Sequence, residues 1–184
     1  MEGKSIKRIE IVDETDMTPE LDAGIRDLLC KCFPADVEVF SRTRRWHGTG
    51  PTYCLVYRDG ATVVGHAGVV CRSILVGETE IFMAGIQNVA VDPDSQGSML
   101  AWALMRKAMK EAGRRGIKFG VLFCLPALER LYAGLKWRTV NVGVTMRGED
   151  GKKIPIPGKN ITMVMELTDE PFPEGDIFLQ GMDW

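Results

Sequence analysis

A strand, a polar turn and a helix follow one another without a break in the middle of the chain. The apolar pattern of Thr79–Val91 leads through Pro93 and the polar residues Gln96–Ser98 into the amphipathic stretch Met99–Ala112. The first N–H groups of such a helix have no acceptor within the helix and lie at the positive end of its dipole, so they can bind an anion, and phosphate in particular. An ordinary capped helix start is the alternative interpretation of the same residues.

The histidines and an arginine cluster are weaker candidates for chemistry. His66 lies within an apolar strand and is predicted to be a hydrogen-bonded core histidine rather than a catalytic base. His47 follows Trp46 at the start of a loop, where it could contact a substrate. The arginines at 42, 44 and 45 favour a solvated helix face over an anion site.

The five cysteines do not form a metal or redox motif. They are Cys30, Cys32, Cys54, Cys71 and Cys124. None belongs to a paired C-x-x-C motif, and the chain has only two histidines, so no metal site is predicted. Four of the five lie in apolar segments, where a free cysteine behaves as a small hydrophobic side chain.

Length and charge limit the classes of function. The 184 residues suffice for one complete hydrophobic core, so residues 1–184 are expected to form a single domain. A net charge of −2 gives no broad attraction to nucleic acid or to a membrane surface, and neither is expected as a partner. No apolar run approaches the roughly 20 residues of a membrane span, and the first residues lack the apolar core of a signal peptide. The expected location is the cytoplasm.

The apolar periodicity predicts a mixed arrangement of strands and helices. Strands are expected at Ser5–Val12, Thr52–Tyr57, Thr62–Val76, Thr79–Val91, Ile117–Cys124, Trp137–Met146 and Ile161–Leu167. Helices are expected from Thr18-Pro19 to Phe33-Pro34 and at Ala35–Trp46, Met99–Ala112 and Ala127–Gly134. Asp59-Gly60 is typical of a hairpin turn. The central strand–helix–strand crossover requires one parallel pair in an otherwise antiparallel sheet, and open α/β sheets bind ligands beyond the carboxyl end of such a strand.

This element order, together with the loop Gln96-Gly97-Ser98-Met99-Leu100-Ala101, resembles the GCN5-related N-acetyltransferase (GNAT) superfamily. The pyrophosphate loop of that family follows the pattern Arg/Gln-x-x-Gly-x-Gly/Ala; Gln96 and Ala101 fit it, and Met99 stands in place of the middle glycine. The resemblance implies an α/β (α+β) fold with a mixed, mostly antiparallel sheet, a splayed parallel strand pair and helices on both faces.

The resemblance also implies acetyl-CoA as the cofactor. Its pantetheine arm would contact the backbone of Val89, Ala90 and Val91. Its diphosphate would bind at Gln96, Gly97, Ser98, Met99, Leu100 and Ala101.

Two branches of the family share segments with this chain. Gly65–Arg72, Arg130–Tyr132 and Pro173–Ile177 are similar to aminoglycoside 2′-N-acetyltransferases. Arg45–Pro51, Val76–Glu78 and Val91–Asp94 are similar to nodulation-factor N-acyltransferases.

Carried over residue by residue, the resemblance assigns roles in acetyl transfer. Tyr132 stands where many members carry a tyrosine that protonates the departing thiolate. Gln87 stands where the aminoglycoside branch has a carboxylate; it can hold a water or the substrate but cannot take a proton at neutral pH. Apart from the resemblance, Asp36, Asp183 and Trp184 are candidates to line an acidic substrate groove; solvated loop and tail charges are the alternative interpretation.

The function expected is therefore transfer of an acetyl group to a primary amine of a small, cationic molecule, such as a polyamine or an amino sugar. One alternative is transfer of a longer acyl chain from acyl-CoA or an acyl carrier protein, for which Met83, Met99, Met105 and Met109 would supply an adaptable apolar surface. Another is a non-catalytic CoA-binding module, because Met99 and Gln87 depart from the family pattern. A homodimer is possible in each case.

Overall fold

The structure is a computed structural model that describes residues 8–46, 48–95, 97, 99–156, 158 and 160–184. The chain divides into two compact units. The first comprises Met1–Trp46, Gly50–Val69 and Gln87–Ala108, and the second comprises His47–Thr49, Val70–Ile86 and Met109–Trp184.

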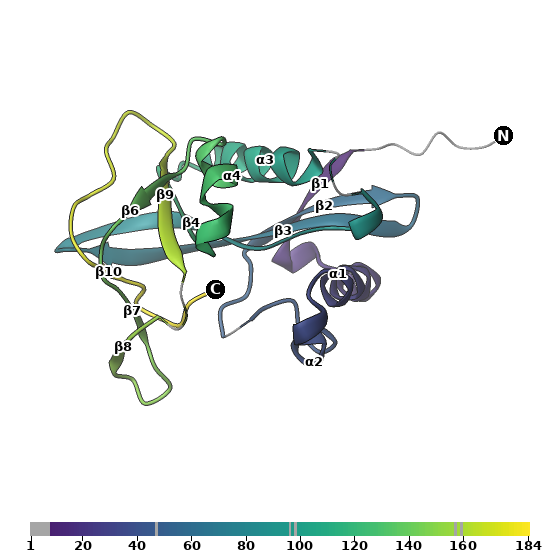
Figure 1. Cartoon of the computed structure of the whole chain (residues 1–184), viewed down its shortest axis with the longest axis horizontal. Coiled ribbons are helices and arrows are strands. Elements are labelled where there is room, and N and C mark those ends of the chain that lie inside the picture. Colours follow the sequence, from purple (N-terminus) through teal and green to yellow (C-terminus); the bar gives the residue numbers. More distant parts are fainter. Residues whose placement is uncertain (1–7, 47, 96, 98, 157, 159) are drawn as a thin grey trace. The chain divides into compact units, whose positions relative to one another are not determined.

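Strands and helices alternate along the chain (Figure 1). The strands are β1 (Ile9–Asp13), β2 (Tyr53–Asp59), β3 (Thr62–Val76), β4 (Thr79–Val91), β5 (Phe119–Cys124), β6 (Arg138–Val140), β7 (Val144–Arg147), β8 (Lys153–Pro155), β9 (Ile161–Glu166) and β10 (Ile177–Phe178). The helices are α1 (Pro19–Cys32), α2 (Val37–Phe40), α3 (Leu100–Arg114) and α4 (Glu129–Ala133), with 3-10 turns at Glu14–Asp16, Pro34–Asp36, Pro93–Ser95 and Pro126–Leu128.

In the first unit, β2 lies between two antiparallel neighbours, β1 and β3. Side chains alternate along a strand, so β2 has two buried faces. Cys54 and Val56 pack into a core with Leu28 and Leu29 of α1. On the opposite face, the Tyr53 hydroxyl donates a hydrogen bond of 3.0 Å to a backbone carbonyl in α3. Within this unit, α1 and α2 therefore cover one side of the sheet and the first half of α3 covers the other (Figure 1).

Local signals place α1 as the sequence predicts. The Thr18 hydroxyl caps the helix by accepting a hydrogen bond from the Leu21 N–H at 3.2 Å, and Pro19 occupies the first turn. Ile25, Leu28 and Leu29 form its buried stripe. The hairpin at Asp59-Gly60 is also confirmed, since Gly60 has a φ of 63° that favours glycine.

In the second unit, β4 and β5 form the predicted parallel pair, with Met83, Ala84 and Gly85 opposite Phe119, Gly120 and Val121. The sheet of this unit runs in the order β6-β9-β5-β4-β3-β10-β7-β8. Both faces of β5 are covered. Phe119 and Val121 join the main core cluster, and a methyl group at Gly120 would lie 2.8 Å from Met109 and from Trp137. Burial on both faces explains the almost unbroken apolar sequence of β5.

The predicted mixed fold and its parallel crossover pair are confirmed. The sheet is not otherwise antiparallel as predicted, because β7 and β10 form a second parallel pair. Several elements also differ in extent. The predicted helix Ala35–Trp46 is only α2, because Arg44 turns inward to form ion pairs with Glu14 and Asp22 instead of continuing a solvated helix. The predicted strand Trp137–Met146 is two strands, since β6 pairs with β9 whereas β7 pairs with β8 and β10.

Two short strands, β8 and β10, are not among the strands that the sequence predicts. β10 pairs with Leu75 and Val76 of β3, about a hundred positions earlier in the chain. A local sequence pattern contains no information on such a distant pairing. Among the described residues, no helix has the length and apolar character needed to cross a membrane.

Candidate active site

A single left-handed residue interrupts β4 before its carboxyl end. Asn88 has a φ of 50° in an otherwise extended strand. Gly68 of β3 is paired with Cys54 of β2, and the Gln87 side chain packs against Gly68, so Gln87 lies on the same face of the sheet as Cys54. Ala90 lies on that face too, because it packs with Cys54 in the core beside α1. Residues on one face of a regular strand are an even number apart, so a separation of three means that Asn88 adds one extra residue. β4 therefore carries a β-bulge at Asn88, a device that redirects side chains and backbone groups near binding sites.

Two hydrogen bonds hold Asn88 in place. His66 Nδ1 lies 2.8 Å from the Asn88 carbonyl oxygen, and the Asn88 Nδ2 amide donates to the Arg44 carbonyl oxygen at 2.6 Å. A carbonyl can only accept, so the proton of the neutral His66 ring sits on Nδ1. Burial lowers the pKa of His66 to about 4, which keeps the ring neutral at physiological pH. The prediction of a hydrogen-bonded core histidine is confirmed.

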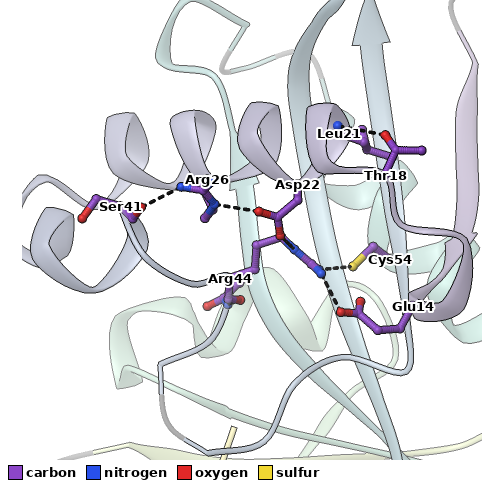
Figure 2. Close-up of polar contacts among 9 residues, drawn as sticks. Glu14, Thr18, Leu21, Asp22, Arg26, Ser41, Arg44 and Cys54 are labelled. Carbon is purple, nitrogen blue, oxygen red and sulfur yellow. Dashed lines mark hydrogen bonds and ion pairs between the residues drawn. The ribbon is translucent and has the colours of Figure 1, made fainter.

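Arg44 is buried rather than solvated, which corrects the prediction made for the arginine cluster. Its side chain is 7% exposed. The guanidinium donates to Asp22 Oδ1 at 2.6 Å, to Glu14 Oε1 at 2.7 Å and to the Cys54 sulfur at 3.5 Å (Figure 2). Arg42 does remain exposed, beside Glu38.

Gln87 is a buried polar side chain beside the bulge. It is 4% exposed, and neither Oε1 nor Nε2 has a hydrogen-bond partner among the described residues. His66 Nε2 and Asn88 Oδ1 are likewise buried without a partner. Buried polar groups are almost always satisfied, so unsatisfied ones indicate a place for water or a ligand. The candidate residue Gln87 thus has the donor and acceptor capacity for that role.

The loop after β4 is fixed by a lysine of α1. Lys31 Nζ lies 2.9 Å from both carboxylate oxygens of Asp92 and 3.2 Å from Asp94. The hydrogen bond to Lys31 lowers the pKa of Asp92. The lysine also partly neutralises two negative charges that would otherwise repel an anion bound nearby.

Residues 97 and 99 give the loop its shape just before α3. Gly97 has a φ of 83° and Met99 a φ of 57°. Methionine therefore adopts the left-handed conformation that glycine favours, at the position where the family pattern has a glycine. Its side chain is 66% exposed and does not fill the turn.

The start of α3 leaves backbone donors available. The Ala103 N–H donates to the carbonyl of Met99, just before the helix, at 3.0 Å. The N–H groups of Leu100, Ala101 and Trp102 have no acceptor within the helix, as expected for a first turn. Binding of an anion by these N–H groups stays a prediction. Gln96, Ser98 and His47, which were also predicted to take part in binding, lie outside the described residues.

The three residues predicted to contact pantetheine differ in exposure. Val89 and Val91 are half-buried, while Ala90 is buried in the core beside α1. The Cys32 thiol donates to the Val91 carbonyl at 3.3 Å and ties the end of β4 to α1. The Val89 N–H follows the bulge directly and is the backbone donor whose direction the bulge sets.

Tyr132 belongs to the second unit, on α4. It is buried, and burial together with the nearby Cys124 thiol raises the pKa of its hydroxyl to about 12. Cys124 ends β5, so Tyr132 lies near the carboxyl end of that strand. The hydroxyl stays protonated at neutral pH and can donate a proton or a hydrogen bond.

The C-terminal residues predicted to line the substrate groove are also in the second unit. Both Asp183 and Trp184 are buried. The Trp184 ring contacts Gly85 of β4, and its centre lies 5.1 Å from that of Phe123. Gly85 precedes Gln87 by two positions in the strand.

Asp36 belongs to the first unit and is half-buried in the 3-10 turn between α1 and α2, where its N–H donates to the Phe33 carbonyl. The described part of the chain holds no group of three or more His, Cys, Asp or Glu side chains arranged to bind a metal ion.

Sequence reasoning missed Asn88 and Arg44. Asparagine is several-fold enriched among left-handed residues, so an Asn in an apolar strand was the available signal for the bulge. No local pattern marks Arg44 as buried, because its partners come from distant segments.

Comparison with known proteins assigns the family. A family model described as an acetyltransferase (GNAT) domain matches residues 16–140. The aminoglycoside 2′-N-acetyltransferase of Mycolicibacterium fortuitum is 26% identical over 173 residues, covering 90% of this chain and 86% of that protein.

Two further comparisons agree. Nodulation protein A of Bradyrhizobium sp. (strain NC92) is 26% identical over 140 residues, covering 66% of each chain. Among solved structures, the GNAT family N-acetyltransferase YhbS from Escherichia coli, in complex with CoA, has the same fold, with a TM-score of 0.64 and 20% identity over 97% of this chain and 93% of that one.

Proposed function

The chain belongs to the GNAT acetyltransferase family, and on that premise we propose that it is an acetyl-CoA-dependent N-acetyltransferase. The acceptor we propose is a primary amine of a small, cationic molecule, such as a polyamine or an amino sugar. The observation that carries the proposal is the turn at Gly97 and Met99, which leaves the N–H groups of Leu100, Ala101 and Trp102 without helical acceptors.

These three N–H groups and the dipole of α3 would hold the diphosphate of the cofactor. The fit is supported by the exposed side chain of Met99, which leaves the turn open, and by Lys31, which offsets the charges of Asp92 and Asp94. Similar proteins crystallised with CoA or acetyl-CoA support the same cofactor. When bound, acetyl-CoA supplies an activated acetyl thioester.

The chain's own groups have three tasks in this proposal. The Val89 N–H donates a hydrogen bond to the thioester oxygen as negative charge develops there, which is usually the largest contribution to such catalysis. The Gln87 amide orients the amine or a water beside it, without taking the proton itself. The Tyr132 hydroxyl would give a proton to the departing thiolate. The proton that the amine loses to water balances the one that Tyr132 then takes back from solvent.

Negative charge is proposed to select a cationic acceptor. Asp36 and Asp183 are the candidate carboxylates, and Trp184 offers an aromatic ring to the same substrate. The similarity to an aminoglycoside 2′-N-acetyltransferase favours amino sugars within this class.

The test combines binding with turnover. Acetyl-CoA should raise the melting temperature of the wild-type protein, as any ligand selective for the native state does. Thiol release should then be followed with acetyl-CoA and a panel of polyamines and aminoglycosides. No thermal shift at millimolar acetyl-CoA would contradict the cofactor assignment.

Two arms of the same assay separate the alternatives. Long-chain acyl-CoA donors replace acetyl-CoA in the first arm, and faster turnover with them would favour a longer-chain acyltransferase. In the second, binding of acetyl-CoA without thiol release for any amine would favour a non-catalytic module. The proposal expects acetyl transfer to be the fastest reaction.

A further inference from the structure

We propose that His66 and Arg44 are positioning residues that hold Asn88 in its left-handed conformation and thereby aim the Gln87 side chain and the Val89 N–H. The inference rests on the proposed function, since it concerns the backbone at which the acetyl group would be held. All of the contacts from which it is argued lie within the first unit of the chain.

The conformation of Asn88 needs support from its surroundings. A residue other than glycine with a φ of 50° is unfavourable in a strand, and such residues persist where neighbouring groups fix them. Asn88 is buried, so its backbone and side-chain polar groups cannot rely on solvent. The two hydrogen bonds from β3 and from the Arg44 segment supply the support that this site requires.

His66 fixes the backbone side of the bulge. Its Nδ1–H donates to the Asn88 carbonyl, and its ring is fully buried on β3. The ring is neutral at physiological pH, so this bond does not change as the pH varies around neutrality. His66 therefore acts on the Asn88–Val89 peptide, whose N–H belongs to Val89.

Arg44 fixes the side-chain end. Its carbonyl accepts the Asn88 amide hydrogen bond, and its guanidinium is anchored on Asp22 of α1 and on Glu14. Figure 2 shows the guanidinium between these two carboxylates, with Asp22 held in turn by Arg26. A carbonyl on a segment anchored at both of these points is a fixed acceptor rather than a mobile loop group.

The conformation of Asn88 matters because of the residues before and after it in β4. Gln87 precedes Asn88, and its amide is buried with no partner among the described residues. Val89 follows it with the proposed oxyanion donor. A change in the φ of Asn88 rotates the peptide between these two groups, and misplacement by about 1 Å can cost roughly a hundredfold in rate.

The experiment compares substitutions at Asn88 that differ in tolerance of a positive φ. Asn88→Ala removes the amide and disfavours the left-handed conformation, whereas Asn88→Gly removes the amide but accepts that conformation. We expect Asn88→Ala to lower kcat by about 10- to 100-fold, with little change in the KM for acetyl-CoA. Asn88→Gly should recover most of this loss. Equal loss in both variants would overturn the proposal.

His66→Phe tests the second contact, because phenylalanine keeps the ring but has no donor. Val63→Ala on the same strand is the matched control: it also opens a buried site, but a valine side chain has no polar group that could hydrogen-bond to Asn88. We expect kcat to fall in His66→Phe and to be unchanged in Val63→Ala at a temperature where both are folded. An unchanged kcat in His66→Phe would overturn the role of this residue.

A readout without substrate separates this inference from the proposed function. The three-bond HN–Hα coupling and the Cα chemical shift of residue 88, measured by NMR, report the left-handed conformation directly. Both should keep their wild-type values in Val63→Ala and move toward extended values in His66→Phe. If the coupling and the chemical shift of residue 88 keep their wild-type values in His66→Phe, His66 does not hold Asn88, even if the enzyme is active. Failure of the wild-type protein to bind acetyl-CoA would contradict only the proposed function.

Discussion

The indole ring of Trp184 lies directly against Gly85 of β4. A methyl group at position 85 would be 2.6 Å from Cζ2 of the ring and 2.7 Å from Nε1. The segment before Trp184 is fixed by Arg72, which donates to the carbonyl oxygens of Leu179 and Met182 at 2.5 and 3.0 Å. Trp184 can therefore pack against β4 only because position 85 has no side chain.

Substitution of Gly85 by alanine should therefore destabilise the protein. The rigid indole ring cannot move aside as the end of a flexible side chain can. We therefore expect the free energy of unfolding to fall by about 1–3 kcal/mol. Gly113→Ala is the matched control: position 113 is in a helix and has open space around it, and alanine there should add about 0.5–1 kcal/mol. Urea unfolding of both variants measures the difference, and equal effects would contradict the packing described.

Met99→Gly should stabilise the turn before α3. The backbone at 99 has a φ of 57°, which costs a residue with a side chain about 1–2 kcal/mol relative to glycine. Gly97→Ala should instead lower the stability, because the φ of Gly97 is 83° and no atom of the described residues lies within 4 Å of an added methyl group to offset the strain. The melting temperatures of the two variants test this, and a less stable Met99→Gly protein would mean that the methionine side chain makes a contact of its own.

Tyr132→Phe should reduce turnover without weakening the binding of acetyl-CoA. Loss of a proton donor to the leaving group is expected to lower kcat by about 100-fold. The pKa of the Tyr132 hydroxyl is raised to about 12, so the group stays protonated and its own ionisation should not limit the rate between pH 7 and roughly pH 10. Tyr57→Phe, which removes a tyrosine hydroxyl in the first unit, is the control for steady-state kinetics. A Tyr132→Phe enzyme with wild-type kcat would remove this residue from the mechanism.

Glu111 should make stability depend on acid pH. Hydrogen bonds from Arg114 and Arg115 lower the pKa of its buried carboxyl to about 2, against an ordinary value of 4.5. A lowered pKa stabilises the folded state above pH 4.5, and this contribution disappears as the pH falls toward 2. Arg114 is mostly exposed and water screens it, so the contribution is roughly 1–2 kcal/mol.

Unfolding free energies measured from pH 7 to pH 2 check this dependence. Glu111→Gln should be less stable than the wild type at neutral pH, and the two curves should approach each other as the pH falls from about 4.5 and meet near pH 2. Glu149→Gln, on an exposed loop, should follow the wild-type curve throughout. A constant gap between Glu111→Gln and the wild type would contradict the assignment.

Local chemistry made a large part of the fold predictable. Thr18 and Pro19 define the start of α1, Asp59-Gly60 defines a hairpin, and the apolar run of β5 implies a strand buried on both faces. The strand–turn–helix unit leading from β4 to α3 was predictable for the same reason. In each case, residues adjacent in the chain supply the cap, the turn or the periodicity.

The finer features of the site depended on contacts between distant segments. The φ of Asn88 is compatible with its residue type, but it is selected by His66 and by a carbonyl at Arg44. The burial of Arg44 depends likewise on Glu14 and Asp22, and the strand β10 exists only because β3 and β7 lie beside it.

By itself, the sequence determined the order of the elements, the parallel crossover and the place where backbone donors gather, because caps, turns and apolar periods act over a few residues. Only the tertiary structure decided the bulge in β4, the burial of Arg44 and the packing of Trp184 against Gly85. Each of these depends on the free energy of pairing groups far apart in the chain, and that free energy is available only once the chain is folded.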